Sequence, residues 1–318
     1  MPTKLTRRSF LGSTATASCL PHYSTRDVTV MNLKLFGAAL LLLLSVRLRG
    51  AEPFFFIQVT DPQLGMFSDN KDFAQETANF ELAVATINRL HPAFVVVSGD
   101  VLNKPGDAAQ TSEYHRIISR VNPAIPVYPV AGNHDIGNVP TPADIAVYTN
   151  HFGPDHYTFQ HQGFIGIVLN SVVIHSPQQT TNQLIAQENW LQAELKNARS
   201  NGAQHVVIFA HHPWFLKTAQ EPDEYFNIPG ERRTRYLAWF REAGVKYLFS
   251  GHTHQDVVAR DAGFEAIATG PVGKPLGKGK SGLRIVIVRD GEIEHLFYHF
   301  GELPNRVDLL APKRSTTL

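Results

Sequence analysis

Polar side chains able to bind a metal follow five apolar segments of this 318-residue chain. In chain order, these segments end in TDPQ, SGD, GNHD, AHHP and GHTH. The candidate ligands at their ends are Asp61, Gln63, Asp100, Asn133, His134, His211, His252 and His254. Oxygen and imidazole ligands in this mixture suit Mn, Fe, Zn or Mg better than a soft thiolate site does. Because one ion needs fewer ligands, we expect two divalent metal ions that share a carboxylate, an arrangement suited to displacement at phosphorus.

Each motif alone also has an ordinary structural explanation. GD is common in any sequence, and GNHD could form a turn because Gly and Asn tolerate left-handed backbone. HHP could be a strand that stops before a proline, and a lone HxH often lies on the surface. All five motifs nevertheless occur in this one chain, and each directly follows an apolar run. We therefore interpret them as one site rather than as five coincidences.

The segments that must position these side chains are predicted strands. Phe54–Thr60 and the runs at 94–97, 127–130, 205–210 and 246–250 are apolar without alternation, which is typical of strands buried on both faces. Helices predicted over 73–90, 112–121, 182–195 and 232–243, the third of them capped by Asn182, separate the strands. The carboxyl ends of parallel strands meet at one edge of a sheet, so their side chains converge there. The strand-rich second half, which ends in a hairpin turned at Asp290-Gly291, favours a sandwich of two sheets with helices outside.

The order of the motifs resembles the calcineurin-like metallophosphoesterase superfamily, whose pattern is DxH, GD, GNH(D/E), H and GHxH. The resemblance covers about residues 54–300. It implies an α/β fold, a four-layer α/β/β/α sandwich with two central mixed sheets. It also implies one metal held by Asp61, Gln63, Asp100 and His254, and a second held by Asp100, Asn133, His211 and His252. A hydroxide between the ions would attack phosphorus, while His134 would stabilise and protonate the leaving oxygen.

Gln63 departs from the superfamily pattern, which usually has His at this position. An amide oxygen is neutral and less basic than an imidazole, so the first metal would bind more loosely. However, DPQLG, VVVSGDVLNKPG, HHPWFL and EYFNIP together are similar to the calcineurin-like phosphoesterase domain-containing protein 1 branch, a group of Ser/Thr protein phosphatases. That resemblance implies protein phosphoserine or phosphothreonine as the substrate, although the branch is best known as intracellular.

Further candidates surround these motifs. Asp135 is assigned to the catalytic group with His134, where it would orient the region; helix capping and a surface ion pair are the alternatives. Lys274, in the basic and glycine-rich segment 269–282, is a candidate for substrate binding together with Asn133 and His134. His212 follows a ligand directly and is expected on the opposite side of its strand.

The polar insert at residues 211–235 follows a predicted ligand and could act as a lid that shapes substrate choice. Trp214, Phe215 and Tyr225 would then stack on substrate or pack within the insert. The alternative is a surface loop whose aromatic side chains are packed.

The first fifty residues indicate processing rather than fold. Thr6–Gly12 resembles a twin-arginine export motif, and a second signal starts at Met31 with the uncharged run Leu35–Val46. We expect an exported protein, periplasmic or extracellular, with no transmembrane segment in its mature form. Retention as a membrane anchor through Leu35–Val46, a buried N-terminal helix, and translation from Met31 remain alternatives. The predicted organisation is a targeting region at 1–50, a metallophosphoesterase domain at 51–304 and a tail at 305–318.

Composition limits the remaining functional classes. The net charge is +1, so no nucleic-acid partner is expected. The single cysteine, Cys19, excludes an internal disulfide. The sequence thus predicts a dimetal phosphomonoesterase acting on a phosphorylated protein or small molecule. The alternatives are a phosphodiesterase acting on cyclic nucleotides or phospholipids, and a non-catalytic metal-bound scaffold.

Overall fold

The computed structural model describes residues 52–311 of the chain. The predicted targeting region at 1–50, with Leu35–Val46, and the end of the predicted tail lie outside the described residues. The helices that are described are all too short or too polar to cross a membrane.

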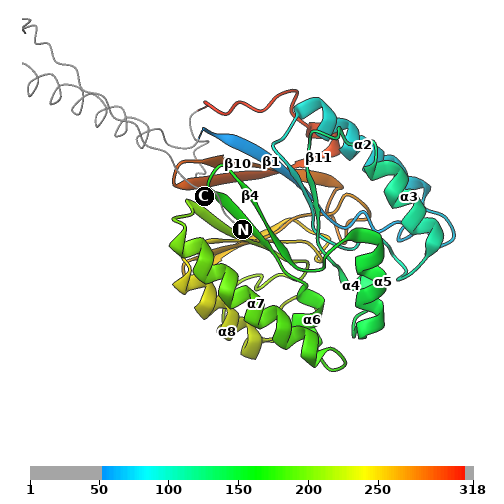
Figure 1. The fold of residues 1–318 in the computed structure, drawn as a ribbon. Coiled ribbons are helices and arrows are strands. Elements are labelled where there is room, and N and C mark those ends of the chain that lie inside the picture. Colours follow the sequence, from blue (N-terminus) through cyan, green and yellow to red (C-terminus); the bar gives the residue numbers. More distant parts are fainter. Residues whose placement is uncertain (1–51, 312–318) are drawn as a thin grey trace, which may run out of the picture. The chain divides into compact units, whose positions relative to one another are not determined.

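Two mixed sheets lie at the centre of the described part of the chain (Figure 1). The first has five strands, in the spatial order β11 (Glu292–His299), β10 (Gly282–Arg289), β1 (Phe54–Val59), β2 (Val95–Val97) and β3 (Val127–Pro129). Strands β1, β2 and β3 are parallel, whereas β10 is antiparallel to both of its neighbours. Arg289 pairs with Glu292 across Asp290-Gly291, which confirms the predicted hairpin. The three parallel strands thus place their carboxyl ends together.

The second sheet has six strands and contains more parallel strands than the first. Their spatial order is β4 (Tyr157–His161), β5 (Phe164–Val168), β6 (His205–Phe209), β7 (Tyr247–Ser250), β9 (Phe264–Ala268) and β8 (Val257–Asp261). Strands β5, β6, β7 and β9 are parallel, and the edge strands β4 and β8 are antiparallel to their neighbours. The second sheet therefore also gathers several carboxyl ends at one edge.

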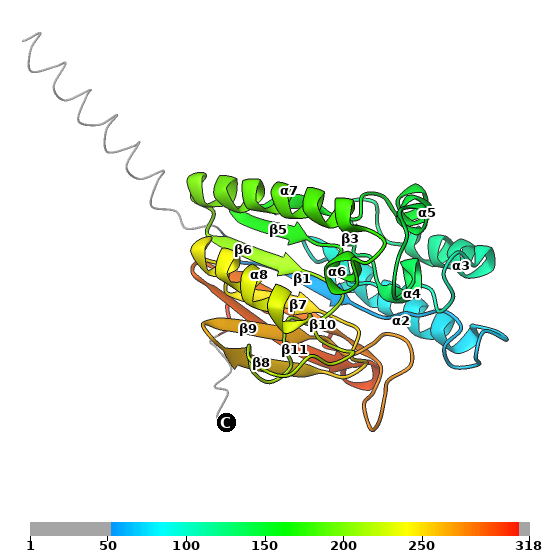
Figure 2. The ribbon, with the colours of Figure 1, turned by 90° about the horizontal axis from the view of Figure 1, so that it is seen from below.

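Helices cover the outer faces of both sheets (Figure 2). Helices α2 (Ala74–Leu90) and α3 (Ala108–Ile118) pack on the first sheet, and α7 (Thr181–Ser200) and α8 (Gly230–Glu242) pack on the second. One apolar cluster lies under each helical layer, and a third, rich in phenylalanine, lies between the sheets. This arrangement confirms the predicted four-layer sandwich.

Short helices near the strand ends were missed from the sequence. They are α4 (Asn133–Ile136), α5 (Pro142–Phe152) and α6 (Ser171–His175), and a single 3-10 turn, η1 (Phe300–Glu302), follows β11. Helix α5 begins with a capping box between Thr141 and Asp144, a signal that was available. Helix α3 begins earlier than predicted because the Asp107 carboxylate accepts hydrogen bonds from the amides of Ala109 and Gln110. Asn182 lies inside α7, whose N-cap is Thr180, so the predicted cap was wrong.

Candidate metal centre

Both sheets contribute predicted ligands at the carboxyl ends of their parallel strands. The first sheet supplies Asp61 and Gln63 after β1, Asp100 after β2 and Asn133 after β3. The second supplies His211 after β6, and His252 and His254 after β7. The site therefore forms where the two sheets face each other, and its assembly depends on their packing.

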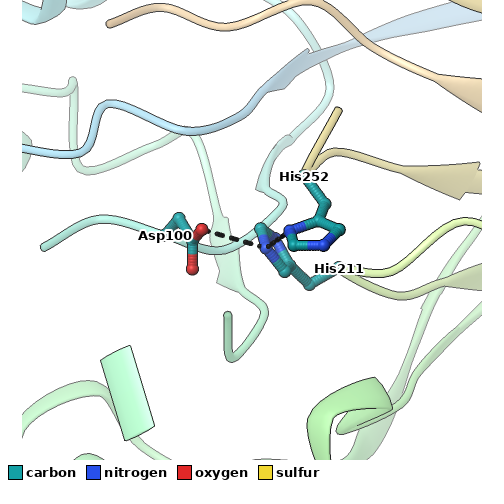
Figure 3. Close-up of side chains that lie close together, drawn as sticks. All are labelled: Asp100, His211 and His252. Atoms are coloured by element: carbon teal, nitrogen blue, oxygen red, sulfur yellow. Dashed lines mark hydrogen bonds and ion pairs between the residues drawn. The ribbon is translucent and has the colours of Figure 1, made fainter. Parts of the chain in front are cut away.

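Two groups of side chains within this set could each hold a metal ion. Asp100, His211 and His252 place one ligand atom each within 4.8 Å of one another, and so do Asp61, Asp100 and His254. His211 Nε2 lies 3.1 Å from Asp100 Oδ2 and 3.2 Å from His252 Nδ1 (Figure 3). Asp100 belongs to both groups, as expected for a shared carboxylate.

Backbone carbonyls fix the orientation of all three imidazoles. His211 Nδ1 donates to the carbonyl of Ser98 at 2.8 Å, and His254 Nδ1 donates to that of Lys274 at 2.5 Å. His252 uses its other nitrogen, Nε2, to donate to the carbonyl of Tyr225 at 3.3 Å. A carbonyl can only accept, so these nitrogens carry the protons. When a ring is neutral, as in metal-ligating histidines, its opposite nitrogen has a lone pair that faces the interior of the centre.

Neighbouring asparagine side chains orient the two amide ligands. The Gln63 amide nitrogen donates to Asn103 Oδ1 at 3.1 Å, and the Asn133 amide nitrogen donates to Asn138 Oδ1 at 2.9 Å. Asn133 Oδ1 consequently lies 3.0 Å from His211 Nε2. Gln63 Oε1 is buried and has no hydrogen-bond donor, and buried Asp100 Oδ2 is contacted by the His211 ring at 3.1 Å. Lone pairs that face one another in a buried site call for a cation, so the residues present fit divalent metals.

The titratable groups of the centre strongly affect one another. Burial opposes ionisation of Asp100, but His211 holds the pKa of this carboxyl well below its usual range. Burial likewise lowers the pKa of His211, yet the Asp100 carboxylate outweighs it and raises this pKa to about 9. Burial and the nearby His211 lower the pKa of His252 to about 3. Burial raises the pKa of Asp61. The pKa shifts of His211 and Asp100 have one cause, the attraction between these two groups, and a bound metal ion would supply the positive charge in place of the imidazolium.

The backbone at the centre adopts conformations that side chains rarely tolerate. Five of the seven predicted ligands have a positive φ, between 41° and 70°: Asp61, Gln63, Asp100, His252 and His254. Left-handed backbone in a residue with a side chain costs roughly 1–3 kcal/mol, and such strain concentrates at functional sites. The rest of the fold therefore offsets the backbone strain that orients these side chains.

His134 lies beside Asp100 at the start of α4. Its backbone amide donates to Asp100 Oδ1 at 2.8 Å, and its ring Nδ1 donates to the carbonyl of Asn103 at 2.9 Å. This second contact leaves Nε2 as the free nitrogen of the ring. The placement is compatible with the predicted contact between His134 and substrate, which stays a prediction.

Asp135 is fully engaged with backbone amides. Its Oδ1 accepts hydrogen bonds from the amides of Val101 and Leu102, and its Oδ2 accepts one from Gly132. Burial, together with the Asp100 carboxylate, raises the pKa of Asp135 to about 7. The carboxylate thereby ties the loop after β2 to the loop after β3, which is a positioning contact.

Lys274 contributes to the centre through its carbonyl, which holds His254, whereas its ammonium group lies 6.0 Å from the centre of the Phe67 ring. Its predicted contact with substrate stays a prediction.

The insert after His211 divides into a packed part and an exposed part. Trp214 and Phe215 are buried in the apolar cluster under α7 and α8. Tyr225 is half exposed, and its hydroxyl lies 3.3 Å from the Asn133 amide nitrogen. Only Tyr225 of the three aromatic residues therefore reaches the centre.

Several supporting residues were missed from the sequence. Asn103 and Asn138 orient the two amides, and the Ser171 hydroxyl accepts hydrogen bonds from the amides of His211 and His212. The His212 ring lies 4.4 Å from that of His252, so the expectation that it points away from the site was wrong. Asn103 and Asn138 lie close to the GD and GNHD motifs, and this proximity was the only available signal.

A sandwich of two mixed sheets, with overlapping sets of carboxylates and imidazoles at its strand ends, has the architecture of a metallohydrolase. The sequence model of the calcineurin-like phosphoesterase family matches residues 56–256. This chain therefore belongs to the calcineurin-like phosphoesterase family, and it is a phosphoric ester hydrolase.

Similar proteins agree with this membership. Serine/threonine-protein phosphatase CPPED1 of Bos taurus is 35% identical over 269 residues, covering 80% of this chain and 86% of the relative. GAP50, the anchor in the inner membrane complex of Plasmodium, has a TM-score of 0.60 at 15% identity, over 79% of this chain and 86% of that one. A dimetal phosphatase from Danio rerio has a TM-score of 0.51 at 16% identity, over 78% and 99%. The two structural likenesses concern the fold alone.

Proposed function

We propose that this protein hydrolyses phosphomonoesters at a two-metal centre and that its substrates are phosphoserine or phosphothreonine side chains of proteins. The observation that carries the proposal is the membership of Asp100 in both groups of potential ligands. The similarity to phosphatases named for serine and threonine supports the substrate class. A monoester dianion suits this site because two carboxylates leave the charge of two dications in excess.

The same seven side chains would hold the ions, with Asp61, Gln63, Asp100 and His254 around one and Asp100, Asn133, His211 and His252 around the other. When bound, such ions activate water as a nucleophile and neutralise charge on phosphoryl oxygens. The ligand types support Mn, Fe, Zn or Mg, and the neutral oxygen of Gln63 favours a hard cation.

The chain's own residues would manage the leaving group. In its imidazolium form, His134 would donate the Nε2 proton to the leaving oxygen and keep the Nδ1 proton, which the Asn103 carbonyl accepts. The Tyr225 hydroxyl, next to Asn133, would line the entrance that the substrate uses. Asp135 would act as a positioning residue through its three backbone contacts.

Export remains part of the proposal, and it rests on the apolar run Leu35–Val46 with its preceding charge at Lys34. Fractionation of cells that produce the full chain would test it. Recovery of the protein only with the cytoplasm would refute export, and recovery with membranes would favour the anchor.

The activity can be tested with the full chain reloaded with Mn²⁺. We expect turnover of an aryl phosphomonoester to exceed that of the matching diester. His134→Ala should lower monoester kcat by about a hundredfold or more, the usual contribution of a general acid. His151→Ala, an exposed histidine of α5, is the matched control.

Other outcomes of this test would redirect the proposal. Preference for the diester would favour a phosphodiesterase. Absence of turnover with two bound metals and a wide set of phosphoesters would favour a scaffold, a role that the fold alone does not exclude.

A further inference from the structure

A cavity of about 320 Å³ lies beside the metal centre, at the loop that joins β9 to β10. Its lining includes His254, Asp256, Lys278, Lys280, Phe297 and His299. His254 faces Asp61 through Nε2, at 3.4 Å from Oδ1, and also contributes to the cavity wall. A group bound in the cavity would therefore be a direct neighbour of the proposed reaction centre.

The loop that forms one wall is attached to His254 itself. The Lys274 carbonyl accepts a hydrogen bond from His254 Nδ1, and the Leu276 amide donates to the His254 carbonyl at 3.1 Å. Figure 2 shows this loop, in orange, projecting beyond the strands that it connects. The lysines of the loop are thus held at a fixed place relative to a predicted metal ligand.

The charge of the cavity is positive. Lys278 and Lys280 are exposed and make no ion pair within residues 52–311. The carboxylate of Asp256 is paired with the buried Arg284, so its charge is already matched. His299 adds a buried Nδ1 atom that lacks a hydrogen-bond partner. Two free ammonium groups, joined by the His299 imidazole when its Nδ1 carries a proton, could together bind a carboxylate or a phosphate.

We propose that this cavity is a subsite for a second anionic group on the substrate. The inference rests on the proposed function, since it assumes that a phosphoester binds at the adjacent centre. The group would be a carboxylate of an acidic residue near the phosphoserine or, in a small molecule, a second phosphate. The enzyme would accordingly select phosphoesters that carry additional negative charge, through Lys278 and Lys280.

Paired substrates test the subsite. Phosphoserine peptides with one glutamate at each neighbouring position are compared with the corresponding glutamine peptides, and a short alkanediol bisphosphate is compared with its alkyl monophosphate. For the parent protein and for each variant, the kcat/KM of every substrate is divided by the kcat/KM of an aryl phosphomonoester. We expect a glutamate to raise the ratio about tenfold, the effect of one charge-assisted hydrogen bond. The double variant Lys278→Ala/Lys280→Ala should abolish the gain, whereas Lys196→Ala, an exposed lysine of α7, should keep it.

Binding of the fluorescently labelled peptides, followed by anisotropy, separates the two proposals. If the glutamate peptide binds more strongly than the glutamine peptide, and this gain depends on Lys278 and Lys280, the subsite is supported. If the same peptides release no phosphate, the proposed function is refuted and the subsite is not. The subsite alone would be overturned if the enzyme hydrolyses the aryl phosphate but the two members of every substrate pair have equal kcat/KM and equal binding. A gain for the bisphosphate only would assign the subsite to small molecules, and a gain for peptides only would assign it to proteins.

Discussion

Gln63 and Asn133 direct their amide oxygens into the centre, although an amide has nearly the same shape when it is turned around. Their orientation is set by Asn103 and Asn138, whose oxygens accept from the amide nitrogens. Asn103 in turn donates to Asn70, and its backbone carbonyl holds His134. One residue outside the motif set therefore supports both a metal ligand and the proposed general acid.

We predict that Asn103→Leu weakens the metal site of Gln63 by about tenfold or more, the usual cost of losing a contact that orients a ligand. Without its acceptor, the Gln63 amide is free to turn its nitrogen toward the ion. Asn103→Asp keeps an acceptor and should retain more of the affinity. Calorimetric titration of the metal-free protein measures the effect, and the exposed Asn305→Leu is the control. Equal affinities for the leucine variant and the parent protein would refute this orienting role.

At the scale of elements, two glycines allow the strand ends to approach each other. A Cβ atom on Gly251, after β7, would lie 1.9 Å from Thr60 Oγ1 and 2.6 Å from Asp61 Oδ2, after β1. A Cβ atom on Gly132 would lie 2.1 Å from Asp100 Oδ1. Gly251 thus allows loops of the two sheets to touch, and Gly132 allows two loops of the first sheet to touch, at places with no room for a methyl group.

Gly251→Ala is therefore expected to separate these loops and displace Asp61. We predict a loss of roughly 1–3 kcal/mol of stability, typical of overpacking, together with loss of one bound metal per chain. Gly301→Ala is the control because nothing lies within 4 Å of the added Cβ atom. Thermal unfolding and metal analysis measure the two effects. An alanine variant that binds both metals would show that the loops can shift without cost to the site.

Elements also differ in how far the sequence predicted them. The buried strands were predictable because residues such as Phe56 and Val96 belong to unbroken apolar runs, and the motifs at their ends marked the centre. Helices α4 and α6 were not, because they are too short to show a helical period. The orientation of Gln63 was also unpredictable, since it depends on contacts with a residue of another loop.

At the scale of the whole molecule, the centre connects the two sheets. Asp61 and Asp100 follow strands of the first sheet, whereas His211, His252 and His254 follow strands of the second. A bound ion would therefore connect the two sheets. Without a metal, the buried carboxylates of Asp61 and Asp100 remain within 4.8 Å of each other, and five ligand residues keep a left-handed backbone. Metal binding should therefore stabilise the complete sandwich rather than one loop.

Removal of the metals is accordingly predicted to lower the thermal stability of the complete fold. Ligand at about a hundred times its Kd contributes about 2.7 kcal/mol, which corresponds to a fall in Tm of roughly 5–10 °C for a domain of this size. Calorimetry with and without EDTA should show one transition that moves as a whole. Asp100→Asn should make the Tm insensitive to EDTA, because Asp100 belongs to both groups of ligands. If the metals are lost from the parent protein and its Tm does not move, the phenylalanines packed between the sheets are sufficient to hold the two sheets together without metal.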